Sequence, residues 1–102
     1  MAEITTIRSL EDIRRLRPQI MTLARQCRAR KVSVFGSCVR GDMRADSDID
    51  FLVDFEEDYS LLDIARLLNG LEDLLGRKVD VIDRLSLRQE LQETVFQEAQ
   101  AL

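Results

Sequence analysis

The chain has 102 residues, 45% of them hydrophobic and 33% charged, and a net charge of −4. This length predicts a single domain over residues 1–102, and the composition excludes a disordered or collagen-like chain. We expect a cytoplasmic protein that does not contact membranes, because the sequence lacks a secretory signal and lacks the apolar run of about 18 residues that a spanning helix needs. Cys27 and Cys38 have no CxxC spacing and the chain has no histidine, which predicts unpaired thiols rather than a zinc site.

The two halves of the chain carry opposite charge. Residues 1–45 hold ten Lys or Arg and four Asp or Glu, a balance of +6, whereas residues 46–102 hold five and fifteen, a balance of −10. This asymmetry fits a basic face beside a carboxylate-rich cation site, two interaction surfaces, or only solvated helix faces. We expect no direct nucleic-acid binding, because the acidic half repels phosphates and the chain has one Tyr, four Phe and no Trp for base stacking.

The first third of the chain predicts a helix, a buried strand and a tight turn. A helix is expected over residues 9–29, where apolar residues recur at helical spacing, and Pro18 marks either a kink or the start of the regular helix. Residues 32–35 are mostly β-branched or aromatic and stop at Gly36, which is typical of a buried strand that ends in a turn. The segment 38–43 is long enough for one helical turn only.

The remainder of the chain adds strands and helices in alternation. After a second strand at 48–55 come a helix at 60–75 stopped by Gly76, a third strand at 78–82 and a last helix at 86–102. An apolar stripe on the last helix faces either the core or a partner, and it consists of Leu87, Leu91, Val95, Ala99 and Leu102. The order α-β-turn-β-α-β-α predicts an α+β fold in which a small mixed β-sheet is backed by helices.

Two features predict a site for phosphates and a metal ion. Gly36-Ser37 leaves a strand in a turn where backbone amides and a hydroxyl can approach phosphate oxygens, although Gly-Ser is also a common structural turn. Asp48 and Asp50 are two positions apart on a strand, so they point to the same side and can bridge a cation such as Mg²⁺, unless they are simply solvated. If the first two strands are antiparallel neighbours, both features meet at one edge of the sheet.

Asp80 is the third candidate acid. It takes the third position of its strand, as Asp50 does in its own, and a parallel arrangement of the two strands would bring them side by side. Asp80 could then complete a metal site or accept a proton from an attacking hydroxyl. Asp83, on the opposite face near the end of the strand, is the weaker candidate.

Two other motifs fit these residues less well. Gly36 and Gly41 have the spacing of a P-loop, but Asp42 stands where that motif needs a lysine to meet the phosphates. A calcium loop that begins at Asp46 would place Phe51 at the position where the sharp turn requires glycine. Neither motif is therefore expected to describe the site.

The spacing of the glycine turn and the acids carries a family resemblance. Gly36-Ser37, ten intervening residues and Asp48-x-Asp50 resemble the signature of the polymerase-beta-type nucleotidyltransferase superfamily. Three stretches resemble its minimal nucleotidyltransferase (MNT) branch in particular, namely residues 35–41, 47–53 and 79–82. Val39 stands where alanine is often seen, which is a small departure from the pattern.

The resemblance implies a nucleotidyltransferase fold and a reaction. An acceptor hydroxyl would attack the α-phosphate of ATP and pyrophosphate would leave, with Asp80 as the base. Two sets of residues are implied, Asp48, Asp50 and Asp80 for two Mg²⁺ ions, and Gly36, Ser37 and Arg40 for phosphate oxygens. Arg40 could equally be a structural hydrogen-bond donor.

The resemblance also implies a partner. We expect the acceptor to come from outside, because 102 residues leave no room for an acceptor-binding domain. MNT proteins of this kind are typically paired with a HEPN-domain ribonuclease toxin, which implies an antitoxin that binds this partner and adenylylates one of its tyrosines. Two alternatives remain: a non-catalytic binding module that masks its partner, and nucleotidyl transfer to a small molecule such as an aminoglycoside, which the missing acceptor domain disfavours.

Overall fold

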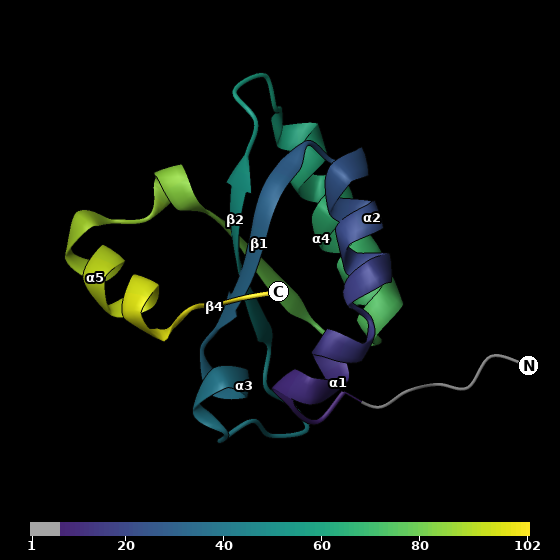
Figure 1. Cartoon of the computed structure of the whole chain (residues 1–102), viewed down its shortest axis with the longest axis vertical. Coiled ribbons are helices and arrows are strands. Elements are labelled where there is room, and N and C mark those ends of the chain that lie inside the picture. The colour runs from purple at the N-terminus through teal and green to yellow at the C-terminus, as the bar shows by residue number, and fades with distance from the viewer. Residues whose placement is uncertain (1–6) are drawn as a thin grey trace, which may run out of the picture.

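A computed structural model describes residues 7–102, so residues 1–6 of the domain expected over 1–102 lie outside the described part. Its centre is a four-stranded mixed sheet in the order β3-β2-β1-β4 (Figure 1). Strand β1 (Ala29–Phe35) runs antiparallel to β2 (Ile49–Phe55), and β2 runs parallel to β3 (Val79–Asp83). The expected small mixed sheet backed by helices is confirmed.

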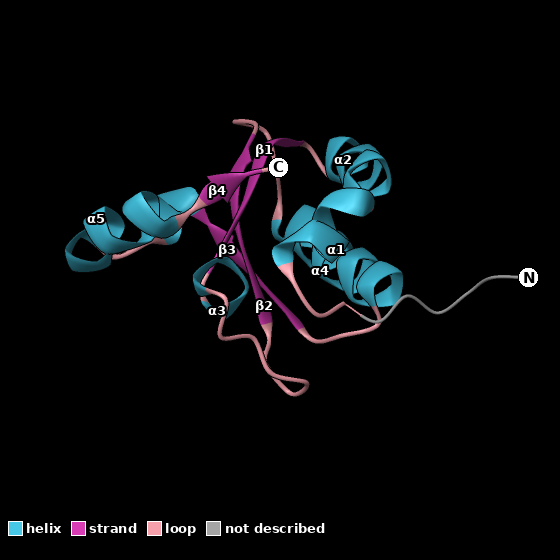
Figure 2. Ribbon diagram, turned by 60° about the horizontal axis from the view of Figure 1, so that its bottom comes forward, coloured by secondary structure: helices cyan, strands magenta, loops and turns pink. Residues whose placement is uncertain are grey.

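Helices α1 (Leu10–Arg15), α2 (Arg17–Gln26) and α4 (Leu61–Leu75) lie on one face of the sheet, as Figure 2 shows. The core fills the space between them and the sheet, and its largest fully buried side chains include Phe51, Ile13, Ile20, Leu67 and Leu71. None of the helices within residues 7–102 is both long and apolar enough to cross a membrane.

Strand β2 shows the predicted alternation. Ile49, Phe51 and Val53 are completely buried on the helix-covered side, because a strand turns successive side chains to opposite faces. Asp50 and Asp54, which fall between them, are only partly buried. The sheet therefore keeps one face for the core and turns its acidic face away from the helices.

The predicted first helix is two helices. The chain breaks at Leu16, whose φ of −96° and ψ of 10° are not helical, and Pro18 lies in the first turn of α2. A proline fits there, because the first amides of a helix have no intrahelical partner to lose. Both cysteines are buried and free, which confirms the expected unpaired thiols.

The predicted last helix is wrong in its extent. The segment consists of a 3₁₀ turn at Arg84–Ser86, helix α5 (Gln89–Glu98) and a short strand β4 (Gln100–Ala101), so three residues of the predicted stripe are not on the helix, namely Leu87, Ala99 and Leu102. β4 pairs with β1, and the Leu102 amide donates to the Val32 carbonyl over 3.1 Å. The open edge of β1 offers backbone groups that need partners, and this overrides the helical spacing.

Helix α5 projects away from the sheet in Figure 1, and none of its residues is buried. Leu91 is 48% exposed and Phe96 is 38% exposed. The sequence left open whether the apolar stripe of this helix faces the core or a partner. The residues of α5 do not belong to the core.

We predict that Leu71→Ala lowers the free energy of unfolding by about 2–5 kcal/mol, because it leaves a cavity in the core. Leu61→Ala on the same helix should change it by less than about 0.5 kcal/mol, since Leu61 is 83% exposed. Urea denaturation of both variants measures the difference. Equal losses would show that α4 does not bury the face described here.

Candidate active site

The first part of the candidate site is the turn at Gly36, directly after β1. Gly36 has φ 83° and ψ −151°, a conformation essentially restricted to glycine, and directly after it comes α3 (Ser37–Arg40), a single helical turn. Gly41, also at φ 83°, ends α3 in the left-handed region. The predicted turn and the predicted one-turn helix are confirmed. Because the segment from Asp46 runs directly into β2, it forms no calcium loop.

Gly36 lies directly against the Asp50 side chain. A Cβ atom added at Gly36 would stand 2.2 Å from Asp50 Oδ2, far inside van der Waals contact. The antiparallel register explains this approach, because Phe35 is paired with Asp50. The two halves of the sequence signature therefore meet at one edge of the sheet, as the antiparallel arrangement predicts.

Asp50 and Asp80 are direct neighbours in the parallel register of β2 and β3. Burial, followed by the charge of Asp80 and a hydrogen bond with it, and then the charge of Asp48, raises the pKa of Asp50 from 3.8 to about 6. Asp48 lies just before β2 and is exposed, as Asp80 is. Asp50 is thus a partly buried acid between two like charges.

These carboxylates are suitable ligands for a hard divalent cation. Mg²⁺ prefers carboxylate oxygens, and a dication beside Asp50 would offset both the burial of its charge and the repulsion from Asp80 and Asp48, which together raise its pKa. Among residues 7–102, however, no three His, Cys, Asp or Glu side chains already lie close enough to hold an ion together. The structure pairs Asp50 with Asp80 on adjacent strands. Asp48 lies outside this pair, in the loop just before β2.

Arg77 is a site residue that the sequence did not indicate. It lies between α4 and β3, and its guanidinium donates to the Arg44 carbonyl over 2.6 Å, to the Ser47 carbonyl, and to the Ile7 carbonyl over 2.7 Å. Ser47 immediately precedes Asp48, so Arg77 fixes the irregular loop that presents this acid. No sequence motif marks such contacts, because the acceptors are backbone oxygens far along the chain.

Asp83, the weaker candidate acid, has a structural role. It is 6% exposed, accepts a hydrogen bond from the Leu85 amide over 3.0 Å and another from the Tyr59 hydroxyl. The bond from Tyr59 to this carboxylate raises the pKa of the tyrosine. Asp83 thus begins the 3₁₀ turn after β3 and is not part of the acidic pair.

Arg40 contacts acids from two directions. Its guanidinium is 3.0 and 3.2 Å from the two carboxylate oxygens of Glu98, at the end of α5, and 3.6 Å from Asp42. The pair with Glu98 raises the pKa of Arg40 further. The same Glu98 carboxylate accepts a hydrogen bond from the Gly36 amide over 2.6 Å. Two of the residues predicted to bind phosphate therefore share one carboxylate.

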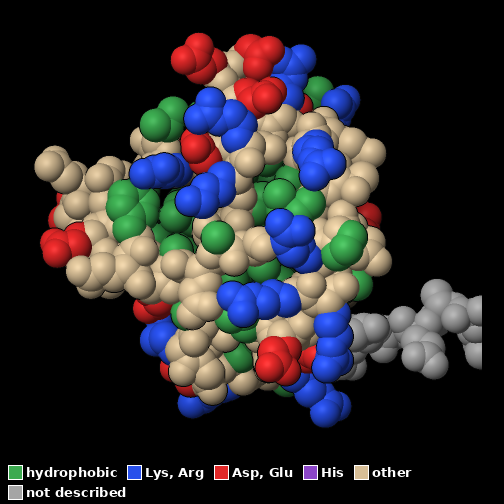
Figure 3. Space-filling view, viewed as in Figure 1, with side chains coloured by type: hydrophobic (Ala, Val, Ile, Leu, Met, Phe, Trp, Pro, Cys, Tyr) green, Lys and Arg blue, Asp and Glu red, His purple; other side chains and the backbone are tan. Residues whose placement is uncertain are grey.

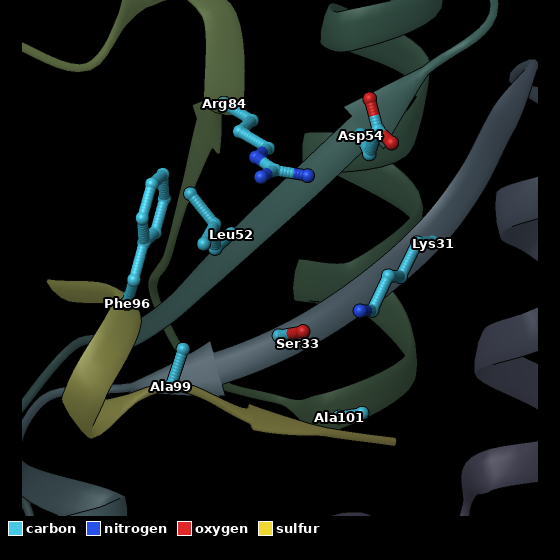
Figure 4. Close-up of a pocket in the computed structure, with 8 residues that line it drawn as sticks. All are labelled: Lys31, Ser33, Leu52, Asp54, Arg84, Phe96, Ala99 and Ala101. Carbon is cyan, nitrogen blue, oxygen red and sulfur yellow. The ribbon is translucent and has the colours of Figure 1, made fainter. Parts of the chain in front are cut away.

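A pocket of about 320 Å³ continues along the acidic face of the sheet (Figure 4). Its lining comes from β1, β2, the 3₁₀ turn and the C-terminal segment, and consists of Lys31, Ser33, Leu52, Asp54, Arg84, Phe96, Ala99 and Ala101. The Arg84 guanidinium lies 5.0 Å from the centre of the Phe96 ring. Leu52 is two positions after Asp50, so the pocket lies on the same face as that acid. Figure 3 shows basic side chains, with apolar ones between them, across one side of the molecule.

Residues 19–102 match the family of polymerase beta nucleotidyltransferases. The chain belongs to this family. Protein adenylyltransferase MntA of Thermococcus cleftensis is 49% identical over 69 residues, which cover 68% of this chain and 70% of MntA. A protein adenylyltransferase homologue of Methanocaldococcus jannaschii is 36% identical over 88 residues, which cover 86% of this chain and 95% of that protein. The chain is a nucleotidyltransferase and a homologue of MntA.

Solved structures agree with this assignment. A minimal nucleotidyltransferase matches with a TM-score of 0.83 at 46% identity, over 92% of this chain and 96% of the other. A toxin–antitoxin structure with AMP-PNP matches with a TM-score of 0.70 at 24% identity, over 82% and 69% of the two chains, which is a likeness of fold. The nucleotidyltransferase fold and the resemblance to the MNT branch are confirmed.

We predict that Gly36→Ala lowers nucleotidyl transfer by about 100-fold or more, because the added methyl group must displace the Asp50 carboxylate. Gly41→Ala is the matched control, since Gly41 also has a positive φ but has no atom within 4 Å of an added Cβ. Single-turnover rates measure the effect on activity, and thermal unfolding reports the backbone strain of each variant. Similar activity losses in both variants would contradict a specific role for the contact with Asp50.

We predict that Asp50→Asn stabilises the protein at pH 7.5 by about 1–2 kcal/mol. The folded-state pKa of Asp50, about 6, lies above the ordinary value of 3.8, so the folded parent protein is favoured below pH 4 and loses this contribution as the pH rises through 6. An uncharged Asn at position 50 does not ionise, so the variant keeps its stability as the pH rises. Urea denaturation at pH 4 and 7.5 measures both proteins, with Asp73→Asn on the exposed side of α4 as the control. A difference that does not grow with pH would contradict the raised pKa.

Proposed function

We propose that this chain transfers AMP from ATP to a tyrosine hydroxyl of a partner HEPN-domain ribonuclease toxin and thereby neutralises it. The observation that carries the proposal is the direct contact of the Gly36 turn with Asp50, beside Asp80. The names of relatives support it, since MntA of Thermococcus cleftensis is a protein adenylyltransferase. Another fold relative is the MNT antitoxin in a complex with a tri-AMPylated HEPN toxin of Shewanella oneidensis.

The glycine turn accounts for the donor side of the reaction. The Gly36 amide, the Ser37 hydroxyl and the Arg40 guanidinium are donors that suit phosphate oxygens, and only a residue without a Cβ lets the backbone come this close to Asp50. Asp48, Asp50 and Asp80 are the residues that would hold two Mg²⁺ ions. Bound Mg²⁺ would neutralise charge on the phosphates and acidify the acceptor hydroxyl.

The chemistry is an in-line displacement at the α-phosphorus. The acceptor oxygen forms a bond to this phosphorus, the bond to the bridging oxygen of the β-phosphate breaks, and pyrophosphate leaves. Asp80 takes the proton of the acceptor hydroxyl. Its exposure favours this role, because a base must reach a hydroxyl that arrives from a second protein.

The open face of the sheet supports an acceptor supplied by another molecule. The acids point away from the helix-covered side, and the pocket beside them is lined by an aromatic ring, an arginine and a lysine. A protein segment that presents a tyrosine could lie along this face and bring its hydroxyl to Asp80. This open arrangement favours a protein acceptor over a small molecule.

A non-catalytic masking function is the second candidate. Leu91 and Phe96 of α5 and Leu85 before it are exposed large apolar side chains, a composition that is typical of a contact surface. Masking alone gives no physical reason to place Asp50 beside Asp80, where the like charge raises its pKa. Catalysis therefore explains more of the structure.

We predict that the double substitution Asp48→Asn with Asp50→Asn abolishes transfer of labelled AMP to the co-purified toxin, a loss of about 1,000-fold or more, because it removes two of the three metal ligands. Mass spectrometry of the toxin locates the modified residue. Asp73→Asn, a charge change remote from the site, should retain the parent rate. Undiminished transfer by the double variant would overturn the two-metal proposal.

The same variants separate the two candidate functions. If catalysis neutralises the toxin, the double variant should leave its ribonuclease activity intact even at stoichiometric amounts. Full inhibition by the inactive variant would instead establish masking as sufficient.

A further inference from the structure

The Glu98 carboxylate occupies the donors that the proposed function assigns to a phosphate. It accepts from the Gly36 amide over 2.6 Å and from the Arg40 guanidinium over 3.0 and 3.2 Å. A backbone amide and a guanidinium that converge on one anion are the donors that proteins use for phosphate oxygens. Here the anion comes from the chain itself, 62 residues after Gly36.

The segment that follows Glu98 is fastened to the body of the protein. Residues 100–101 pair with β1, and the Leu102 amide donates to the Val32 carbonyl over 3.1 Å. Arg14 donates to the Gln100 side chain over 3.0 Å, and Arg17 donates to the Leu102 carbonyl. Residues 98–102, here called the C-terminal latch, therefore hold the carboxylate over the Gly36 turn.

The helix before the latch can move at little cost. No residue of α5 is buried, and β4 has only two residues. Opening the latch therefore breaks the short β4 pairing and a few polar contacts, and of the latch residues only Leu102 packs against the core. A short edge strand and a helix without a buried face are the least stable parts of a fold.

We propose that the C-terminal latch is an autoinhibitory contact, in which Glu98 fills a phosphate position of the donor site and the triphosphate must displace it. This inference rests on the proposed function, because it takes the Gly36 amide and Arg40 as phosphate donors. Two anions cannot occupy the same donors, so carboxylate and phosphate compete. The apparent nucleotide affinity is the intrinsic affinity reduced by the fraction of molecules with an open latch.

Removing the carboxylate should tighten nucleotide binding. We expect the Glu98→Ala variant to bind the Mg²⁺ complex of α,β-methylene-ATP roughly fivefold more tightly than the parent, because it loses one partly exposed ion pair and one hydrogen bond from the Gly36 amide. The affinity of Glu98→Gln should lie between those of the parent and Glu98→Ala. Glu93→Gln is the matched control, because it removes the same charge from an exposed position of α5. Isothermal titration calorimetry measures all four proteins.

Amide hydrogen exchange at Leu102 reports the latch directly. The nucleotide analogue should speed this exchange in the parent, whereas in Glu98→Ala the exchange should already be fast and change little. Equal affinities of all four proteins, or weaker binding by Glu98→Ala, would overturn the latch and leave the nucleotidyl-transfer proposal intact. No binding by any of the proteins would overturn both.

Discussion

The close approach of the Gly36 backbone to the Asp50 carboxylate is the contact on which the site depends. It requires a residue without a side chain at the end of β1, an antiparallel register that pairs Phe35 with Asp50, and a neighbouring parallel strand that adds Asp80. Two of these three requirements belong to the sheet, and the third belongs to the turn directly after β1. The sheet thus determines how far the Gly36 turn stands from the acids, and the helices on its other face pack against it through the core.

The acids around the Gly36 turn differ in how firmly the fold holds them. Asp50 and Asp80 lie within paired strands, whereas Glu98 reaches the Gly36 turn from a helix that buries none of its residues. Asp80, whose charge adds to burial in raising the pKa of Asp50, is therefore held by the sheet, whereas Glu98 is held by contacts of a helix outside the core. Such a difference in local stability is the physical basis of the proposed latch.

Local patterns in the sequence were sufficient for most of the fold and for the acids. The strand phase of residues 49–55, the approach of Gly36 to Asp50 and the order of the elements from β1 to β3 follow from side-chain alternation and turn chemistry, and the structure confirms them. Strand β4 was missed, because two residues carry no periodicity and Leu102 fits a helical spacing. Glu98 and the guanidinium that fixes the loop before Asp48 were missed because their contacts join residues far apart in sequence.

Arg77 has a consequence for how this enzyme can vary. Its guanidinium donates to three backbone carbonyls, at Ile7, Arg44 and Ser47, and to no side chain among them. The hold of Arg77 on this loop therefore depends on the path of the backbone and not on the identity of the loop's side chains, apart from Ser47, whose hydroxyl accepts a hydrogen bond from the Arg44 amide over 2.9 Å. The position of Asp48 is thus tied to a backbone contact between Ser47 and a residue 30 positions further along the chain.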